Sequence, residues 1–186
     1  MILASRQAYF KKCPPPVRPS THPPATDKKL QHVNLSLPST YALVLCNSSA
    51  ATLHIGALGT VDLSRGYYVY IGSAFGPGGL KGRLRHHAAP VKRPRWHVDY
   101  LRPQMTLTGV WCLLSEQKKE HYWARLWSDF PGATIPSTGF GTSDCTCKAH
   151  LFHFEIIPPK NELKQFLQEG ENLVFLLPSV LIRILN

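Results

Sequence analysis

The chain has 186 residues with 44% hydrophobic content, which is enough for one domain with a sizeable core but leaves no room for two independent enzymes. Its formal charge of +10 and isoelectric point near 9.6 favour a polyanionic partner, with nucleic acid as the first candidate. No run of eighteen apolar residues occurs, so the sequence predicts no membrane span.

Residues 1–38 are predicted to be a disordered, proline-rich basic arm. The first forty residues hold seven of the sixteen prolines, and six Lys or Arg against one acid. A segment of this composition cannot bury enough apolar surface to offset the entropy of ordering. The same features are compatible with an organelle transit peptide, or with an upstream extension that the working protein does not need.

The cysteines of the chain are Cys13, Cys46, Cys112, Cys145 and Cys147. They form an odd set without the spacing of a disulfide framework, and no signal peptide with an apolar core precedes them. We therefore expect the cytoplasm or another reducing compartment, with organelle targeting by the arm as the alternative.

Residues 39–157 are expected to form one α+β domain, built on a small, mainly antiparallel sheet with flanking helices. Strands are predicted at 41–46, 52–55, 61–63, 67–71 and 107–114, where aromatic and β-branched residues gather. The segment EQKKEHYWARLWSDF at 116–130 is the best helix, while 96–101 is compatible with a helical turn or a strand. Residues 158–186 are expected to be a C-terminal helical extension, whose apolar end packs on the domain or docks to another chain.

The stretch 67–85, YYVYIGSAFGPGGLKGRLR, combines a strand, a glycine turn and the start of a basic helix. On that helix Arg83 and His87 share one face. Leu80 and Leu84 share another face and can anchor the helix to a core. This combination suggests a phosphate site.

Basic residues follow the glycine turn closely, because 81–102 holds seven Lys or Arg against Asp99 alone. One interpretation is a nucleic-acid-binding surface, and the other is a solvated helix face and loop. The candidate nucleic-acid contacts are Lys81, Arg85, Lys92, Arg93, Arg95 and His97. In the segment RPRWHVDYL, Trp96, His97 and Asp99 could supply a stacking surface and a second acid, or could belong to a core.

Glu120 stands three residues before Trp123 and seven before Trp127, which places it on or beside the inward face of its helix. A buried carboxylate requires a partner, and a metal ion, Arg83 or a phosphate-bound water network would each supply one. The alternative is that Glu120 is simply a good helix former near a helix N-terminus. Glu116, four residues earlier, is the reserve candidate.

Three blocks occur in the order YVYIGSAFGPGGLKGRLRHH, RPRWHVDYL and PSTGFGTSDCTCKAHLFHF. Together they resemble the Uri-like branch of the GIY-YIG nuclease superfamily, long catalogued as a domain of unknown function, over residues 41–155. The segment KKEHYWA is likewise similar to the family's segment with a fixed Glu before Trp-Ala.

The resemblance implies a metal-dependent endonuclease that hydrolyses phosphodiester bonds in nucleic acid, with DNA as the first choice and with one divalent metal, Mg²⁺ or Mn²⁺. The catalytic residues that it implies are Tyr41, Tyr70, Arg83, His87 and Glu120, of which Glu120 is the metal ligand. The alternative is a non-catalytic nucleic-acid-binding domain on the same fold.

These roles agree with the chemistry of the side chains. Arg83 can hold a non-bridging phosphate oxygen, and a hard cation on one carboxylate can neutralise charge on the leaving oxygen. A phenol with a pKa of about 10 is a poor base unless cations favour its ionised form, so His87 is the alternative proton acceptor. Without the motif, Tyr41 and Tyr70 are ordinary packing residues of strands.

The last block also contains Cys145, Cys147, His150 and His153, which could be zinc ligands because zinc selects thiolates and imidazoles. Such a site would make the chain a zinc-stabilised interaction module. The Cys-x-Cys spacing differs from the common Cys-x-x-Cys pattern. The alternatives are a tight loop that leads into a strand with His150 or His153 near the site, or a nucleic-acid groove lined by Asp144 or His150.

Overall fold

The computed structural model of the chain describes residues 34–91, 93–178 and 181. The arm predicted at 1–38 lies outside the described residues except for 34–38, and Lys92 lies outside them as well. Within these described ranges, no helix has both the length and the apolar character that crossing a membrane requires.

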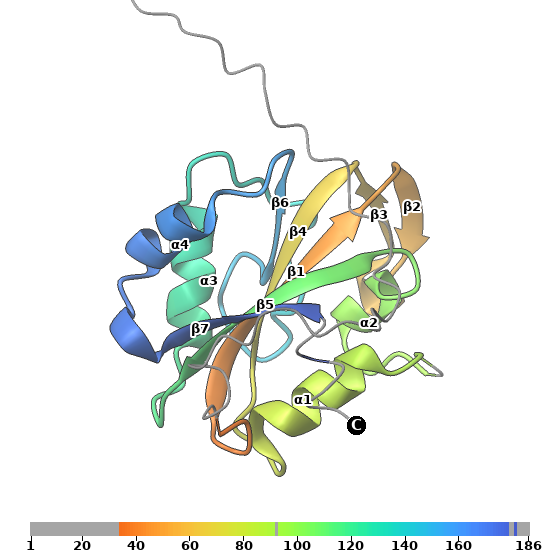
Figure 1. Ribbon diagram of the computed structural model, residues 1–186. Helices are drawn as coiled ribbons and strands as arrows, with labels where there is room; N and C mark the ends of the chain where they lie inside the picture. The colour runs from red at the N-terminus through yellow and green to blue at the C-terminus, as the bar shows by residue number, and fades with distance from the viewer. Residues whose placement is uncertain (1–33, 92, 179–180, 182–186) are drawn as a thin grey trace, which may run out of the picture.

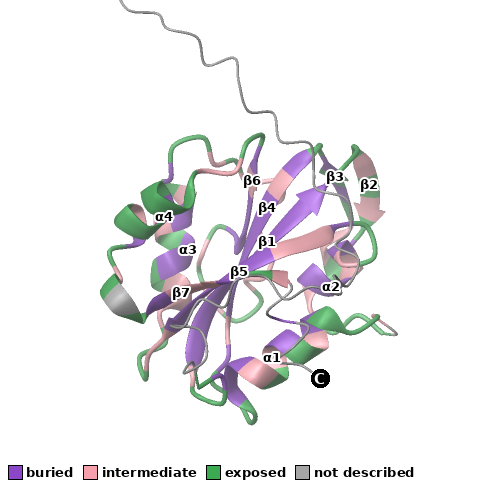
Figure 2. Cartoon of the chain, in the orientation of Figure 1, coloured by how far each residue is buried: buried purple, intermediate pink, exposed green. Residues whose placement is uncertain are grey.

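The centre of the fold is β1 (Ser39–Asn47), which is buried along its whole length (Figure 2). In the part of the chain that the structure describes, β1 belongs to a five-stranded sheet of order β6-β4-β1-β5-β7 (Figure 1). The other strands are β4 (Gly66–Ser73), β5 (Thr106–Leu114), β6 (Leu151–Phe154) and β7 (Leu173–Leu176), and every pairing is antiparallel. The continuous apolar run YALVLC fits a strand whose two faces are both covered.

A separate hairpin lies beside the main sheet. It consists of β2 (Ala51–His54) and β3 (Thr60–Leu63), which pair antiparallel and are joined through a short 3-10 helix at Gly56–Leu58. Ile55, Val61 and Leu63 are buried and pack into the same core as Leu43 and Leu45 of β1. The short strands predicted at 52–55 and 61–63 are therefore confirmed as this hairpin.

Helices cover both faces of the sheet (Figure 1). On one face α1 (Gly79–Ala88) and α2 (His97–Leu101) pack against the side chains of Leu43, Leu45 and Tyr68. On the other face α3 (Glu120–Ser128) and α4 (Lys160–Leu167) pack against Val44 and Ile71. The α+β class with an antiparallel sheet and flanking helices is confirmed.

Two predicted helical segments differ from the structure. The helix expected at 116–130 begins only at Glu120, because Thr40 Oγ1 accepts the backbone N–H of Lys119 at 3.0 Å and fixes the start. The C-terminal segment is helical over Lys160–Leu167, but Leu173–Leu176 forms β7 beside β5. The physical reason is the open edge of β5, whose backbone groups gain hydrogen-bond partners from a further strand.

Candidate functional site

Tyr41 lies across Gly72 on the neighbouring strand, since the register of β1 and β4 pairs these two residues. A Cβ atom on Gly72 would stand 2.6 Å from both Cζ and Oη of Tyr41. No side chain can occupy that space while the ring stays in place. The glycine of Tyr70-Ile71-Gly72 therefore has a steric reason, which is the close approach of an aromatic ring from the next strand.

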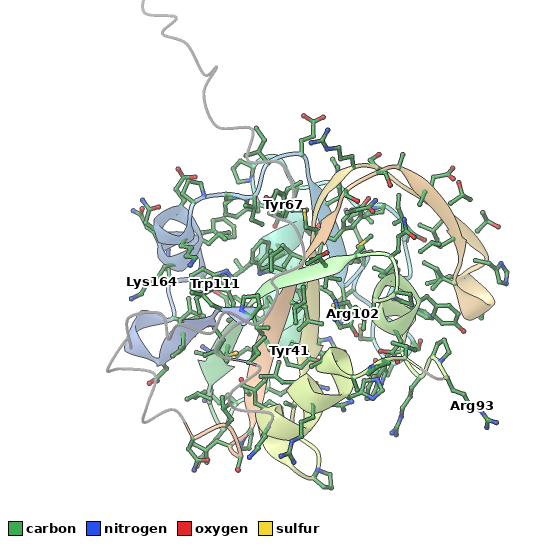
Figure 3. The ribbon with its side chains drawn as sticks, turned by 45° about the vertical axis from the view of Figure 1, so that its right-hand side comes forward. Tyr41, Tyr67, Arg93, Arg102, Trp111 and Lys164 are labelled. Atoms are coloured by element: carbon green, nitrogen blue, oxygen red, sulfur yellow. The ribbon has the colours of Figure 1, made fainter. Side chains whose placement is uncertain are left out.

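The Tyr41 hydroxyl meets His87 on α1, with 2.8 Å between Oη and Nε2. Figure 3 shows Tyr41 on β1 beside α1. His87 is only 1% exposed, and Leu84 and Leu80 are buried one and two turns earlier on the helix. Packing of these leucines holds α1 at the distance that brings His87 to Tyr41.

Asp99 stands on the far side of His87, with its Oδ1 3.9 Å from Nδ1 of the imidazole. Its carboxylate is fully buried and accepts the backbone N–H groups of Arg95 and Trp96 at 2.8 and 3.0 Å. Burial alone would raise the pKa of Asp99, but these hydrogen bonds and the one from His86 outweigh burial and hold that pKa below its ordinary value. An ionised Asp99 therefore faces His87, and the order Asp99, His87, Tyr41 forms one line of polar groups.

His87 is neutral at physiological pH, because burial lowers the pKa of its imidazole to about 3 against the opposing effect of Asp99. The negative charge beside Nδ1 favours the tautomer with its proton on that nitrogen. In this tautomer Nε2 is the acceptor, and the Tyr41 hydroxyl donates to it.

Both motif tyrosines are protonated in this environment. Burial raises the pKa of Tyr41 well above its ordinary value, and it raises the pKa of Tyr70 as well. The charge of Arg83 acts in the opposite direction on each hydroxyl, while Glu120 raises both pKa values. Arg83 and Glu120 thus lie within electrostatic reach of both tyrosines, although they come from opposite faces of the sheet.

Arg83 is partly exposed on α1, and its guanidinium carbon lies 4.3 Å from the centre of the Trp96 ring. Arg95 approaches the same ring at 5.1 Å. This cation–π contact restrains the Arg83 side chain while leaving its N–H groups available as donors. Trp96 therefore supports Arg83. The Trp96 ring also packs against His86, with 4.5 Å between the two ring centres.

Glu120 is the first residue of α3, and its side chain is 13% exposed. Its Oε2 lies 3.1 Å from Nζ of Lys118, and its Oε1 lies 3.5 Å from Nδ1 of His150. Burial opposes ionisation, but the polar side chains of His150, Ser73 and Lys118 beside the carboxylate lower the pKa of Glu120 to about 2. The carboxylate is thus ionised at the end of β4. Lys118 and His150 lie beside it, in place of Arg83, which was one of the three partners that the sequence suggested. The reserve candidate Glu116 is exposed and precedes the helix.

The candidate nucleic-acid contacts fall into two groups. Arg85, Arg93 and Arg95 are exposed, Lys81 is partly exposed, and Figure 3 shows Arg93 on the loop between α1 and α2. His97 differs, because its Nδ1 accepts the Gly141 N–H at 2.9 Å and its ring packs on Phe140. His97 thus holds the loop before β6.

Two backbone donors that follow the glycine turn are already engaged and are not available for a phosphate. At the start of α1, the N–H of Leu80 donates to the carbonyl of Leu37 at 3.3 Å, and the N–H of Lys81 donates to that of Leu35 at 2.7 Å. Those carbonyl groups satisfy two of the N–H groups at the helix N-terminus. These two N–H groups therefore do not contribute to a phosphate site, whereas side chains such as Arg83 can.

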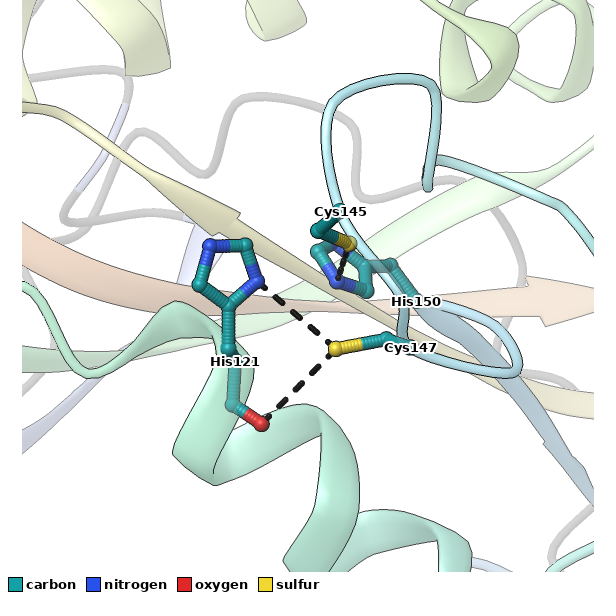
Figure 4. Close-up of side chains that lie close together, drawn as sticks. All are labelled: His121, Cys145, Cys147 and His150. Atoms are coloured by element: carbon teal, nitrogen blue, oxygen red, sulfur yellow. Dashed lines mark hydrogen bonds between the residues drawn. The ribbon is translucent and has the colours of Figure 1, made fainter.

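Four side chains that bind soft metals meet beside Glu120 (Figure 4). They are His121, Cys145, Cys147 and His150, and their ligand atoms all lie within 4.8 Å of one another. His153, which the sequence suggested as a possible fourth ligand, instead lies with Thr134 and the Arg65 carbonyl. The sequence missed His121 because only the folded chain brings α3 next to the 139–150 loop.

The buried neutral His87 gives a prediction for the pH dependence of stability. The unfolded chain takes up a proton near pH 6.5, but the folded chain accepts it only near pH 3, so acid favours unfolding. Between pH 7.5 and pH 5 we expect the free energy of unfolding to fall by about 2 kcal/mol, at up to about 1.4 kcal/mol per pH unit below pH 6.5. Urea titrations at several pH values measure this slope.

The variant His87→Gln keeps an acceptor for Tyr41 and removes the titrating group, so most of the slope should disappear. His97, whose pKa burial also lowers, contributes in the same direction and remains in that variant. His54 is exposed on β2, and His54→Gln is the control that should keep the parent slope. An unchanged slope in His87→Gln would contradict the prediction.

One known protein family matches most of this sequence. The family model described as "Domain of unknown function DUF123" matches residues 40–172, which contain the whole candidate site. Searches of curated proteins and of solved structures returned no significant match. Since the matched region covers well over half of the sequence, the chain belongs to the family described as Domain of unknown function DUF123.

Proposed function

We propose that this chain is a metal-dependent endonuclease of the GIY-YIG type, from the Uri-like branch, which hydrolyses phosphodiester bonds in nucleic acid, first of all DNA. The observation that carries the proposal is the ionised, partly exposed Glu120 at the end of β4, within electrostatic reach of the buried tyrosine pair. A carboxylate, an arginine and a polar proton path at one end of a sheet suit phosphoryl chemistry.

Glu120 fits a divalent metal in two respects. Its carboxylate is ionised at neutral pH, and its side chain retains some exposure, which leaves access for the water ligands that Mg²⁺ keeps. Glu120 would hold Mg²⁺ or Mn²⁺, and the ion would neutralise negative charge that develops on the leaving oxygen.

Arg83 would bind a non-bridging phosphate oxygen. Its guanidinium is held by the Trp96 ring and lies within electrostatic reach of Tyr41. A fixed cation beside the reacting phosphate stabilises the extra negative charge of the transition state without reorganisation.

Proton removal would run through Tyr41 to His87. As a water oxygen forms the new bond to phosphorus and the leaving oxygen departs with its electron pair, the water proton passes to Tyr41 Oη. The phenolic proton passes in turn to His87 Nε2, along the 2.8 Å hydrogen bond. Asp99 favours the protonated imidazole but leaves the pKa of His87 at about 3 in the free protein, and a bound anionic phosphate would raise that pKa further.

Nucleic acid would lie along the basic side chains of α1 and the loop that follows. Arg85, Arg93 and Arg95 are exposed there, and Lys81 is partly exposed. Lys92 is a further proposed contact from outside the described residues. Contacts of this kind bind the phosphate backbone and are weakened by salt.

A pair of arginine variants separates catalysis from binding. Arg83→Ala should reduce the single-turnover cleavage rate in Mg²⁺ or Mn²⁺ by about 10²-fold at saturating DNA, because it removes transition-state charge stabilisation. Arg85→Ala, two residues along the same helix, should leave that rate near the parent value and weaken DNA binding in a salt-dependent manner. Cleavage assays on duplex, branched and single-stranded substrates, together with titrations of binding, measure both quantities.

If the parent cuts no substrate with either metal yet binds DNA in a salt-dependent manner, the non-catalytic binding domain on the same fold is correct. If Arg83→Ala cuts as fast as the parent, Arg83 does not contact the reacting phosphate.

A further inference from the structure

We propose that His121, Cys145, Cys147 and His150 bind one zinc ion, which joins the 139–150 loop to the N-terminus of α3. His121 comes from α3, and the other three residues come from the loop that leads into β6 (Figure 4). Two thiolates and two imidazoles form a ligand set that selects zinc, and it differs in chemistry from the oxygen ligand Glu120. The inference depends on this ligand set alone and stands independently of the proposed nuclease activity.

The distances fit tetrahedral coordination. Sγ of Cys147 lies 3.6 Å from Nδ1 of His121, and Sγ of Cys145 lies 3.5 Å from Nε2 of His150. Zinc–sulfur bonds of about 2.3 Å and zinc–nitrogen bonds of about 2.0 Å at tetrahedral angles place sulfur and nitrogen about 3.5 Å apart. All four ligand atoms lie within 4.8 Å of one another, so one ion can reach every atom with small adjustments.

The loop holds its three ligands in place through backbone hydrogen bonds. Gly139 donates to the Lys148 carbonyl at 2.8 Å, and His150 donates to the Phe140 carbonyl at 2.8 Å, which closes the loop at its base. Gly141 has φ of +75°, a conformation that other residues rarely adopt, beside the His150 side chain. A closed loop with preset ligands lowers the entropic cost of binding a metal.

The Glu120 carboxylate lies close to Nδ1 of His150, the ring nitrogen that would not bind the metal. With Nε2 on the metal, the proton of His150 lies on Nδ1, which stands 3.5 Å from Oε1 of Glu120. Carboxylates in this position orient zinc-bound histidines and increase their basicity. The buried Nδ1 has no hydrogen-bond partner within the described residues, and Glu120 is the carboxylate closest to serving it.

The other cluster of potential ligands is weaker. His86, His87 and Asp99 also lie close together, but they offer three ligands without a thiolate, and Nε2 of His86 is already hydrogen-bonded to the Asp99 carboxylate at 3.1 Å. A metal there would have to displace that hydrogen bond and would lack the sulfur ligands that select zinc. Hydrogen bonds within the His121 cluster, by contrast, join only the proposed ligands and the carbonyl of His121.

The test is the metal content of the full chain, expressed with zinc and purified without a metal-affinity step. We expect about one zinc per chain by mass spectrometry, and thiolate-to-metal absorption bands when Co²⁺ replaces zinc. Cys147→Ser should lose the zinc, whereas His153→Gln, which changes the histidine outside the cluster, should retain it. Glu120→Gln should also retain it, which separates this site from the proposed Mg²⁺ or Mn²⁺ site.

Removal of zinc from the parent by a chelator should lower the melting temperature by more than about 5 °C, with recovery on adding zinc. If Cys147→Ser does not fold, titration of the metal-free parent with Co²⁺ gives the same information through the thiolate bands. A parent that carries no zinc and shows no Co²⁺ thiolate bands would overturn the proposal, as would Cys147→Ser with full zinc content.

Discussion

Replacing Glu120 by Gln is expected to lower metal-dependent cleavage by about 10²–10³-fold, the largest catalytic effect we predict. The amide has almost the same shape as the carboxylate but carries no charge, and neutral amides are weak ligands for Mg²⁺. In the folded chain the pKa of Glu120 is about 2, so the parent presents a negative charge throughout the pH range of an assay. Single-turnover cleavage with Mg²⁺ and with Mn²⁺ measures the loss.

Glu116→Gln is the matched control, because it makes the same chemical change four residues earlier. Glu116 is exposed and precedes α3, and we expect its replacement to leave cleavage unchanged. Melting curves of both variants establish that any loss is not unfolding. Parent-like cleavage by Glu120→Gln would remove this residue from the proposed metal site, and loss of activity in Glu116→Gln would transfer the role to the reserve candidate.

Much of the fold follows from local patterns in the sequence. The apolar run at 41–46 predicts a strand covered on both faces, and that strand is the centre of the sheet. Periodicity alone did not identify β7, since a short apolar run such as LVFL is compatible with a helix or a strand. Pairing with the otherwise open edge of β5 makes this segment a strand, and that edge exists only in the folded chain.

For the candidate site, too, some features follow from local sequence patterns and others depend on contacts that only the folded chain makes. Helix geometry predicts that Arg83 and His87 share a face, and the spacing of Glu120 from Trp123 predicts an inward carboxylate. The approach of Asp99 to His87 depends on the path of the loop between α1 and α2. The sequence therefore indicated a second acid in this region but not its position beside His87. His121 joins the cysteines through a contact between α3 and a distant loop, which spacing in sequence cannot indicate.

Gly72→Ala is expected to lower the free energy of unfolding by about 1–3 kcal/mol, because it forces an atom into the Tyr41 ring. The added Cβ would lie 2.6 Å from Cζ and from Oη, and the buried ring cannot move aside without losing its hydrogen bond to His87. Nucleic-acid cleavage should fall in parallel, since the proposed proton path begins at that hydroxyl. Urea unfolding and the cleavage assay measure the two effects.

Gly82→Ala makes the same substitution ten residues later, and we expect the opposite sign. Gly82 is exposed on α1, where the nearest atom to an added Cβ is the Pro77 carbonyl oxygen at 3.4 Å. Alanine favours a helix over glycine by about 1 kcal/mol, so this variant should be more stable than the parent. In a Tyr41→Leu background the cost of Gly72→Ala should shrink, because the colliding atoms are gone. An equal cost in both backgrounds would mean that contact with the Tyr41 ring is not what requires glycine in the Tyr-Ile-Gly motif.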